Sequence, residues 1–110
     1  MNVALDQTVT FDFLLHNPFT GAVSDADALP ACAVFEDTTD VPILAPVPAK
    51  RAALVGDYRV SFVTSLANGF EEGKSYNVVA SATVAGVPAK ARVGAFIVQS
   101  GSVAAPGTSL

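Results

Sequence analysis

Apolar and polar residues alternate along most of this chain, beginning with residues 8–15. The apolar members of this run share one side: Val9, Phe11, Phe13 and Leu15. Because successive side chains of a β-strand point to opposite faces, this period of two predicts a strand with one face on the core. The same pattern in residues 58–63 predicts that Tyr58, Val60 and Phe62 point inward. No segment shows a helical period.

Turn residues separate the other predicted strands. Asn17, Pro18 and Gly21 predict a turn after the first strand. Residues 37–40 predict a hairpin turn after a strand at about 31–36. Residues 76–84 and 87–98 predict a long final hairpin around residues 85–86. Gly94, inside the last strand, predicts a bulge or the close approach of another backbone.

The segment of residues 41–49 is extended in character but contains Pro42, Pro46 and Pro48. Proline cannot donate a backbone hydrogen bond to a neighbouring strand. The sequence therefore predicts either an edge strand or an irregular segment that crosses between sheets.

Tyr76 follows Phe70 by six residues, with Gly73 in the turn between them and a predicted strand after the tyrosine. This is the spacing of a tyrosine corner, in which the hydroxyl bonds to upstream backbone in Greek-key sandwiches. We expect Tyr76 to be largely buried, with its hydroxyl bonded to backbone within residues 70–73.

Six to seven short strands without a helix predict an all-β fold, an antiparallel sandwich of two sheets, with a small barrel as the alternative. The length of 110 residues fits one domain. We assign residues 7–98 to the sandwich, residues 1–6 to an N-terminal arm and residues 99–110 to a flexible C-terminal tail.

Composition adds a hint about function. Hydrophobic residues make up 51% of the chain and charged residues 15%, against about 25% charged in typical domains. This favours either a component of an assembly, partly covered by a partner, or simply an Ala/Val-rich sequence from a GC-rich genome. The net charge of −4 argues against nucleic acid as the main ligand.

Candidate chemistry is sparse. His16 is the single histidine and Cys32 the single cysteine, so neither a disulfide nor a cysteine-rich zinc site is expected. The acidic pair Asp25 and Asp27, and the acidic residues 36–40, lack the spacing of a calcium loop. The sequence predicts no enzyme activity, no cofactor and no metal site.

Residues 1–6 do not show the pattern of an export signal, which is a basic start followed by an apolar run. No stretch approaches the ~20 apolar residues that a membrane span needs. We therefore expect synthesis in a reducing cytoplasm and no membrane partner.

Several short motifs resemble those of small immunoglobulin-like domains of bacteria and phages. They are Gly56-Asp57-Tyr58 at the start of a predicted strand, the turn Phe70-x-x-Gly73-x-x-Tyr76, and Phe96-x-Val98 at the end of the last predicted strand. The resemblance covers residues 7–98 and implies an antiparallel immunoglobulin-like β-sandwich. The proline-bearing segment of residues 41–48 departs from the pattern.

A single such domain is similar to small virion proteins of tailed bacteriophages. This implies capsid decoration through the major capsid protein or another virion protein, and assembly in the bacterial host cytoplasm. The low charge and the apolar excess predict that the isolated protein either self-associates into a homo-oligomer, most simply a trimer, or docks onto a repeating protein lattice. The alternatives to capsid decoration are a tail, baseplate or host-surface-binding module and a cytoplasmic bacterial protein-interaction domain. The absence of Trp, with Phe19 and Phe70 as the loop aromatics, weighs against carbohydrate binding.

We expect partner contacts at an end or edge of the sandwich. The candidate residues belong to the N-terminal arm and the proline-bearing edge: Met1, Asn2, Val3, Ala4, Leu5, Asp6, Val41, Pro42, Pro46 and Pro48. The loops of residues 17–27 and the C-terminal tail are weaker candidates. Because residues 1–6 precede the first predicted strand and should add little to the core, we expect their deletion to weaken particle binding and leave thermal unfolding nearly unchanged.

Overall fold

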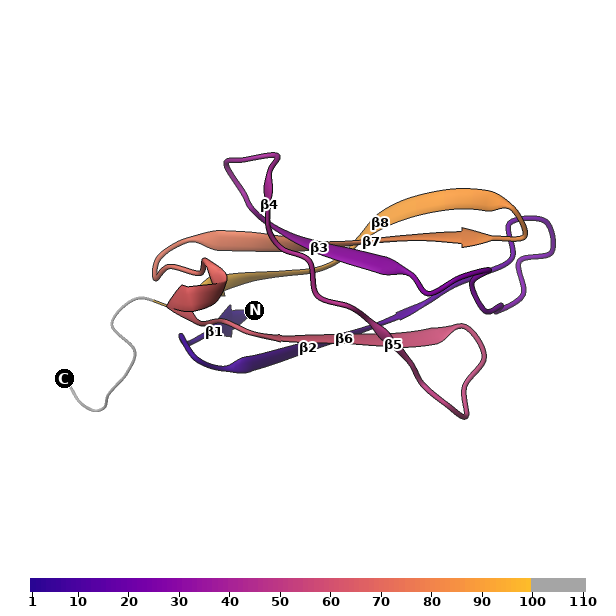
Figure 1. Cartoon of the computed structure of the whole chain (residues 1–110), viewed down its shortest axis with the longest axis horizontal. Coiled ribbons are helices and arrows are strands. Elements are labelled where there is room, and N and C mark those ends of the chain that lie inside the picture. Colours follow the sequence, from indigo (N-terminus) through magenta and orange to yellow (C-terminus); the bar gives the residue numbers. More distant parts are fainter. Residues whose placement is uncertain (100–110) are drawn as a thin grey trace.

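The computed structural model describes residues 1–99 and shows a nearly all-β protein of two facing sheets (Figure 1). Eight strands build the sheets: β1 (Asn2–Val3), β2 (Thr8–Leu14), β3 (Ala31–Glu36), β4 (Pro42–Leu44), β5 (Ala49–Lys50), β6 (Asp57–Val63), β7 (Ser75–Val84) and β8 (Val87–Val98). A single 3-10 turn, η1 (Leu66–Asn68), is the one helical element in the described part of the chain. The predicted all-β sandwich is confirmed.

One sheet has five strands in the order β1-β8-β7-β3-β4, and the other has three in the order β2-β6-β5. Neighbouring strands are antiparallel, except that β1 runs parallel to β8. The strand count exceeds the predicted six to seven because β1 and β5 have two residues each. Two residues are too few to show an alternation.

The core lies between the sheets and is filled by the inward residues of the alternating strands. Val9 and Phe13 of β2 are buried, as are all three predicted inward residues of β6. An aromatic cluster holds the sheets together at one end, and its ring centroids lie 4.8–5.9 Å apart. Its members come from both sheets and the segment between β6 and β7: Phe62, Phe70, Tyr76 and Phe96.

The glycine in β8 has a specific packing role. The β7–β8 register shifts after the pair Val78–Gly94, which is the predicted bulge. A Cβ at Gly94 would lie 2.4 Å from the Phe11 ring, nearer than real Cβ atoms ever come. The group that approaches this glycine most closely is therefore an aromatic ring, the Phe11 side chain.

The proline-bearing segment crosses between the sheets. β4 forms one edge of the five-stranded sheet and β5 one edge of the three-stranded sheet, so the chain leaves one layer and joins the other between them (Figure 1). Both short strands lie at edges, where a missing N–H donor costs least.

The N-terminal residues form part of the sandwich. β1 pairs with the end of β8, and Val3 is 4% exposed within the core cluster. The Thr64 hydroxyl donates to the carbonyl oxygen of Ala4 at 2.8 Å and accepts from the N–H of Gln7 at 3.1 Å, which fixes the turn into β2. The expectation that residues 1–6 add little to the core is therefore wrong.

Candidate functional site

The Phe70–Tyr76 turn has the geometry that the spacing predicts. Tyr76 is 1% exposed, and its hydroxyl oxygen accepts a hydrogen bond from the N–H of Glu71 at 2.8 Å. Its ring meets that of Phe70 edge-on at 4.8 Å. Gly73 has a φ of 83°, and its N–H donates to the carbonyl of Val98. Burial raises the pKa of the Tyr76 hydroxyl. These contacts tie the turn to the core, which is a structural role.

The two candidate nucleophilic or basic residues sit in different surroundings. Cys32 is 5% exposed, and burial raises the pKa of its thiol to about 11, so the thiol stays protonated at neutral pH. His16 is exposed and forms an isolated bridge with Val23 at the end of β2. A protonated, buried thiol is a poor nucleophile.

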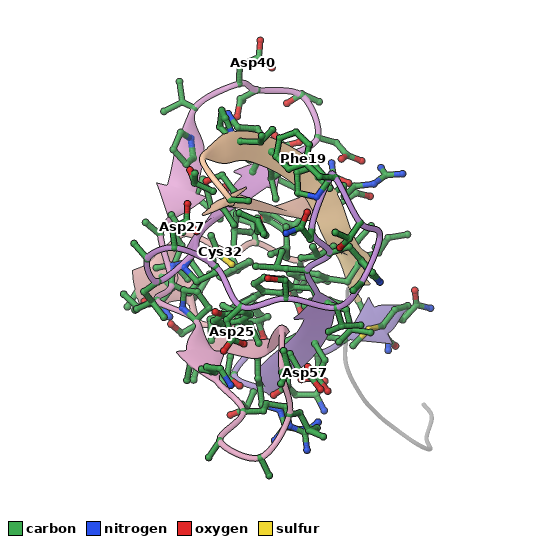
Figure 2. The ribbon with its side chains drawn as sticks, turned by 90° about the vertical axis from the view of Figure 1, so that its right-hand side faces the viewer. Phe19, Asp25, Asp27, Cys32, Asp40 and Asp57 are labelled. Carbon is green, nitrogen blue, oxygen red and sulfur yellow. The ribbon has the colours of Figure 1, made fainter. Side chains whose placement is uncertain are left out.

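The first acidic pair organises loops. The Asp25 carboxylate accepts from the N–H of Gly56 at 2.6 Å and lies 3.5 Å from the Lys50 ammonium group. Asp27 accepts from the N–H groups of Ala85 and Gly86 in the β7–β8 turn, at 3.1 and 2.9 Å. Figure 2 shows both carboxylates on the loop that leads into β3. Backbone N–H groups from segments that are distant in the sequence donate hydrogen bonds to these two carboxylates.

Within residues 1–99, no group of three or more His, Cys, Asp or Glu side chains is placed to hold a metal ion. No helix in this part of the chain is long and apolar enough to cross a membrane.

The outer face of the five-stranded sheet carries a hollow of about 580 Å³, which we call the outer hollow. Its floor includes Phe35 of β3 and Val79 of β7. The β3–β4 turn, with Asp37 and Asp40, borders one side, and Lys90 and Arg92 of β8 border the other. Neither Lys90 nor Arg92 is among the residues for which the sequence predicts partner contacts.

A second hollow of about 240 Å³ opens on the side of the sandwich between β2 and β8, and we call it the side groove. Ala91 lies opposite the buried Ala80, and Ala89 lies opposite Ala82, so both alanines of β8 are on the core side of the sheet. Both are nevertheless exposed. The three-stranded sheet does not extend far enough to cover this part of β8.

β2 forms the other border of the side groove and is an edge strand. Backbone bonds at the two ends of the β2–β6 ladder involve Gln7 and Leu15. Because hydrogen bonding alternates along an antiparallel pair, the odd-numbered residues between them face β6. The N–H and C=O groups of the even-numbered residues of β2 therefore point away from β6, the only strand that pairs with β2 within residues 1–99, and β2 contains no proline.

Some of the predicted partner-contact residues are exposed in the structure and others are buried. Met1 is 66% exposed and Val41 71% exposed, whereas Val3 and Pro48 are buried. The two candidate segments end up at opposite edges of the same sheet, since β1 and β4 are its outer strands. Phe19, on the loop after β2, is 75% exposed (Figure 2). The C-terminal tail, apart from Gln99, lies outside the described residues.

Neither the side groove nor the outer hollow was predicted from the sequence. The sequence contains only part of the pattern that would indicate them. Small residues on both strands of the β7–β8 hairpin belong to the side groove, and two basic residues close together in β8 belong to the outer hollow. Comparison with protein-family models, curated proteins and solved structures finds no match to this chain.

Proposed function

We propose that this chain is a structural virion protein of a tailed bacteriophage that decorates the capsid by binding the lattice of the major capsid protein. The observation that carries the proposal is the side groove, where apolar residues on the core side of β8 stay exposed beside an unpaired edge of β2. Such an opening suits an extended segment of a neighbouring protein, which can add a strand and cover the apolar residues.

The strand order supports an immunoglobulin-like reading of the sandwich. In this interpretation β3, β7 and β8 would take the places of strands C, F and G, and β2, β6 and β5 those of B, E and D. Tyr76 then stands near the start of strand F, the usual place of the tyrosine corner. In that fold strand A lies beside B, whereas within residues 1–99 no strand besides β6 pairs with β2.

Decoration of a shell fits the surface of this protein. Large apolar side chains are exposed at several places, Met1, Phe19, Val41 and Val47 among them. A lattice presents the same docking site many times, so a modest contact at each site sums to a large stabilisation of the shell. The proposed contact needs neither a catalytic residue nor a cofactor.

The proposal is tested by quantifying the chain in purified particles and by changing the side groove. Ala89→Glu and Ala91→Glu place a carboxylate in the groove at positions that are already exposed. We expect the native chain to be present in many copies per particle, and each variant to be depleted at least tenfold. Ala67→Glu is the matched control, since Ala67 is an exposed alanine on η1 and does not line the groove.

Circular dichroism of each variant checks that the sandwich still folds. Full binding by the folded Ala89 and Ala91 variants would refute the side groove as the docking site. Absence of the native chain from particles would refute the virion role itself.

A further inference from the structure

The basic side chains of this protein are unevenly paired. In the described residues Lys50, Arg51, Arg59 and Lys74 each lie within 3.5 Å of a carboxylate oxygen. Lys90 and Arg92 form no ion pair within residues 1–99, and both border the outer hollow. Arg92 has an uncharged partner, since its guanidinium donates to the amide oxygen of Asn77 at 3.2 Å.

The carboxylates on the other side of the outer hollow also form no ion pair in the described part of the chain. Glu36 bonds to Thr38, Asp37 accepts from the Asn77 amide, and Asp40 is exposed, and none of the three belongs to an ion pair among the described residues. The hollow therefore has an acidic side and a basic side, and neither forms an ion pair within residues 1–99.

The sheet register separates the two sides. Ala33, Val79 and Arg92 stand in one row across the outer face, and Ala31, Ser81 and Lys90 stand in the next. The acidic residues lie at the β3–β4 turn, with β7 between them and β8. The turn rises above the sheet in Figure 1, and Asp40 stands at the top of the molecule in Figure 2. The outer face thus has an acidic turn that projects from it and, beside the turn, a hollow whose far edge carries Lys90 and Arg92.

We propose that the outer face binds a second copy of this chain, in a two-fold dimer that places the β3–β4 turn of each copy in the outer hollow of the other. A two-fold axis between the faces exchanges the acidic and basic sides, so each acidic turn meets Lys90 and Arg92 of its partner. Contacts of this kind are isologous, and every charge contact is formed twice. The dimer does not depend on the proposed virion role.

Apolar and charged groups have different parts in this interface. Burial of Phe35, Val79 and the alanines of the floor supplies affinity. Exposed ion pairs add little affinity but select orientation, because like charges in a wrong arrangement repel. The charge pattern favours the two-fold dimer over the trimer that the composition predicts.

A charge exchange tests the dimer on the full chain by sedimentation velocity. In the variant Lys90→Glu/Arg92→Glu both sides of the hollow are acidic, and in Asp37→Lys/Asp40→Lys the acidic turn becomes basic. We expect the native chain to sediment as a dimer and each variant alone to dissociate at least tenfold more readily. An equimolar mixture of the two variants restores opposite charges at both contacts and should sediment as a dimer again.

The matched control is Glu71→Lys/Glu72→Lys, which changes the net charge as much as the aspartate variant does but lies on the turn before β7. It should dimerise like the native chain and fail to rescue the Lys90/Arg92 variant. A native monomer or trimer would overturn the proposal, and so would two dissociated variants whose mixture stays monomeric.

Discussion

At the scale of single residues, Tyr76 shows how one hydroxyl connects a turn to the core. Its ring packs among Phe70 and Phe96, while its oxygen accepts the backbone N–H of Glu71 at 2.8 Å. The turn before β7 would otherwise leave this partly buried donor without a partner. An unsatisfied donor of this kind costs more than the average hydrogen bond contributes.

Tyr76→Phe tests this contact. The ring is retained and only the hydroxyl is lost, so we expect the free energy of unfolding to fall by about 1–2 kcal/mol. Urea unfolding measures the change. Thr10→Val is the control, because it removes an exposed hydroxyl that is bonded only to Ser61. Equal stability of the native and Tyr76→Phe proteins would show that the Glu71 N–H finds water instead.

At the scale of elements, β1 contributes more than its length suggests. Its two residues pair with Ile97 and Val98 of β8, and Val3 fills a core position. In two further backbone hydrogen bonds, the N–H of Ile97 donates to the carbonyl of Met1 and the N–H of Gln99 donates to the carbonyl of Val3. This strand therefore protects the end of β8 and closes the core there.

Removing residues 2–4 should lower the free energy of unfolding by about 2–4 kcal/mol, because the burial of Val3 and the ladder hydrogen bonds of β1 are lost. Thermal and urea unfolding measure this. Asn2→Ala, which shortens an exposed side chain on the same strand, should stay within about 0.5 kcal/mol of native. A truncated chain with native stability would contradict the structural role of β1.

At the scale of the whole molecule, the outer face of the three-stranded sheet is tied by an ion-pair network. Asp12 of β2 lies 2.9 Å from Arg59 of β6 and 3.4 Å from Arg51, which follows β5. The hydrogen bond and charge of Arg59 lower the pKa of the Asp12 carboxyl below its ordinary value of 3.8. Hydrogen bonds from Thr38 lower the pKa of Glu36 in the same way.

A lowered pKa in the folded state predicts the direction of acid sensitivity. The contribution of Asp12 is fully present above its ordinary pKa of 3.8 and is lost as the pH falls through its lower, folded-state value. We expect stability to decline below about pH 4 and Asp12→Asn to flatten that decline. Urea unfolding at a series of pH values measures it, with Glu72→Gln as an exposed control. An Asp12→Asn profile parallel to the native one would contradict the assignment.

What the sequence determined by itself is local. The alternation in β2 and β6 indicates which side of each strand is apolar, and those sides face the core in the structure. The spacing of Phe70, Gly73 and Tyr76 specifies a turn in which the Tyr76 hydroxyl and ring contact residues only five and six positions earlier, Glu71 and Phe70. The prolines at residues 42, 46 and 48 indicate an edge strand or a crossing segment, because a missing N–H donor is tolerated there: Pro42 lies in the edge strand β4, and Pro46 and Pro48 lie in the crossing between β4 and β5.

The tertiary structure alone decided the two candidate surfaces and the place of the N-terminus. Two residues of β1 have no readable period, and only β8 as a neighbour makes them a strand. Ala89 and Ala91 face the core side but stay exposed, since burial depends on how far the opposite sheet extends. Lys90 and the acidic β3–β4 turn share one hollow because strand order, which alternation does not encode, puts only β7 between β8 and β3.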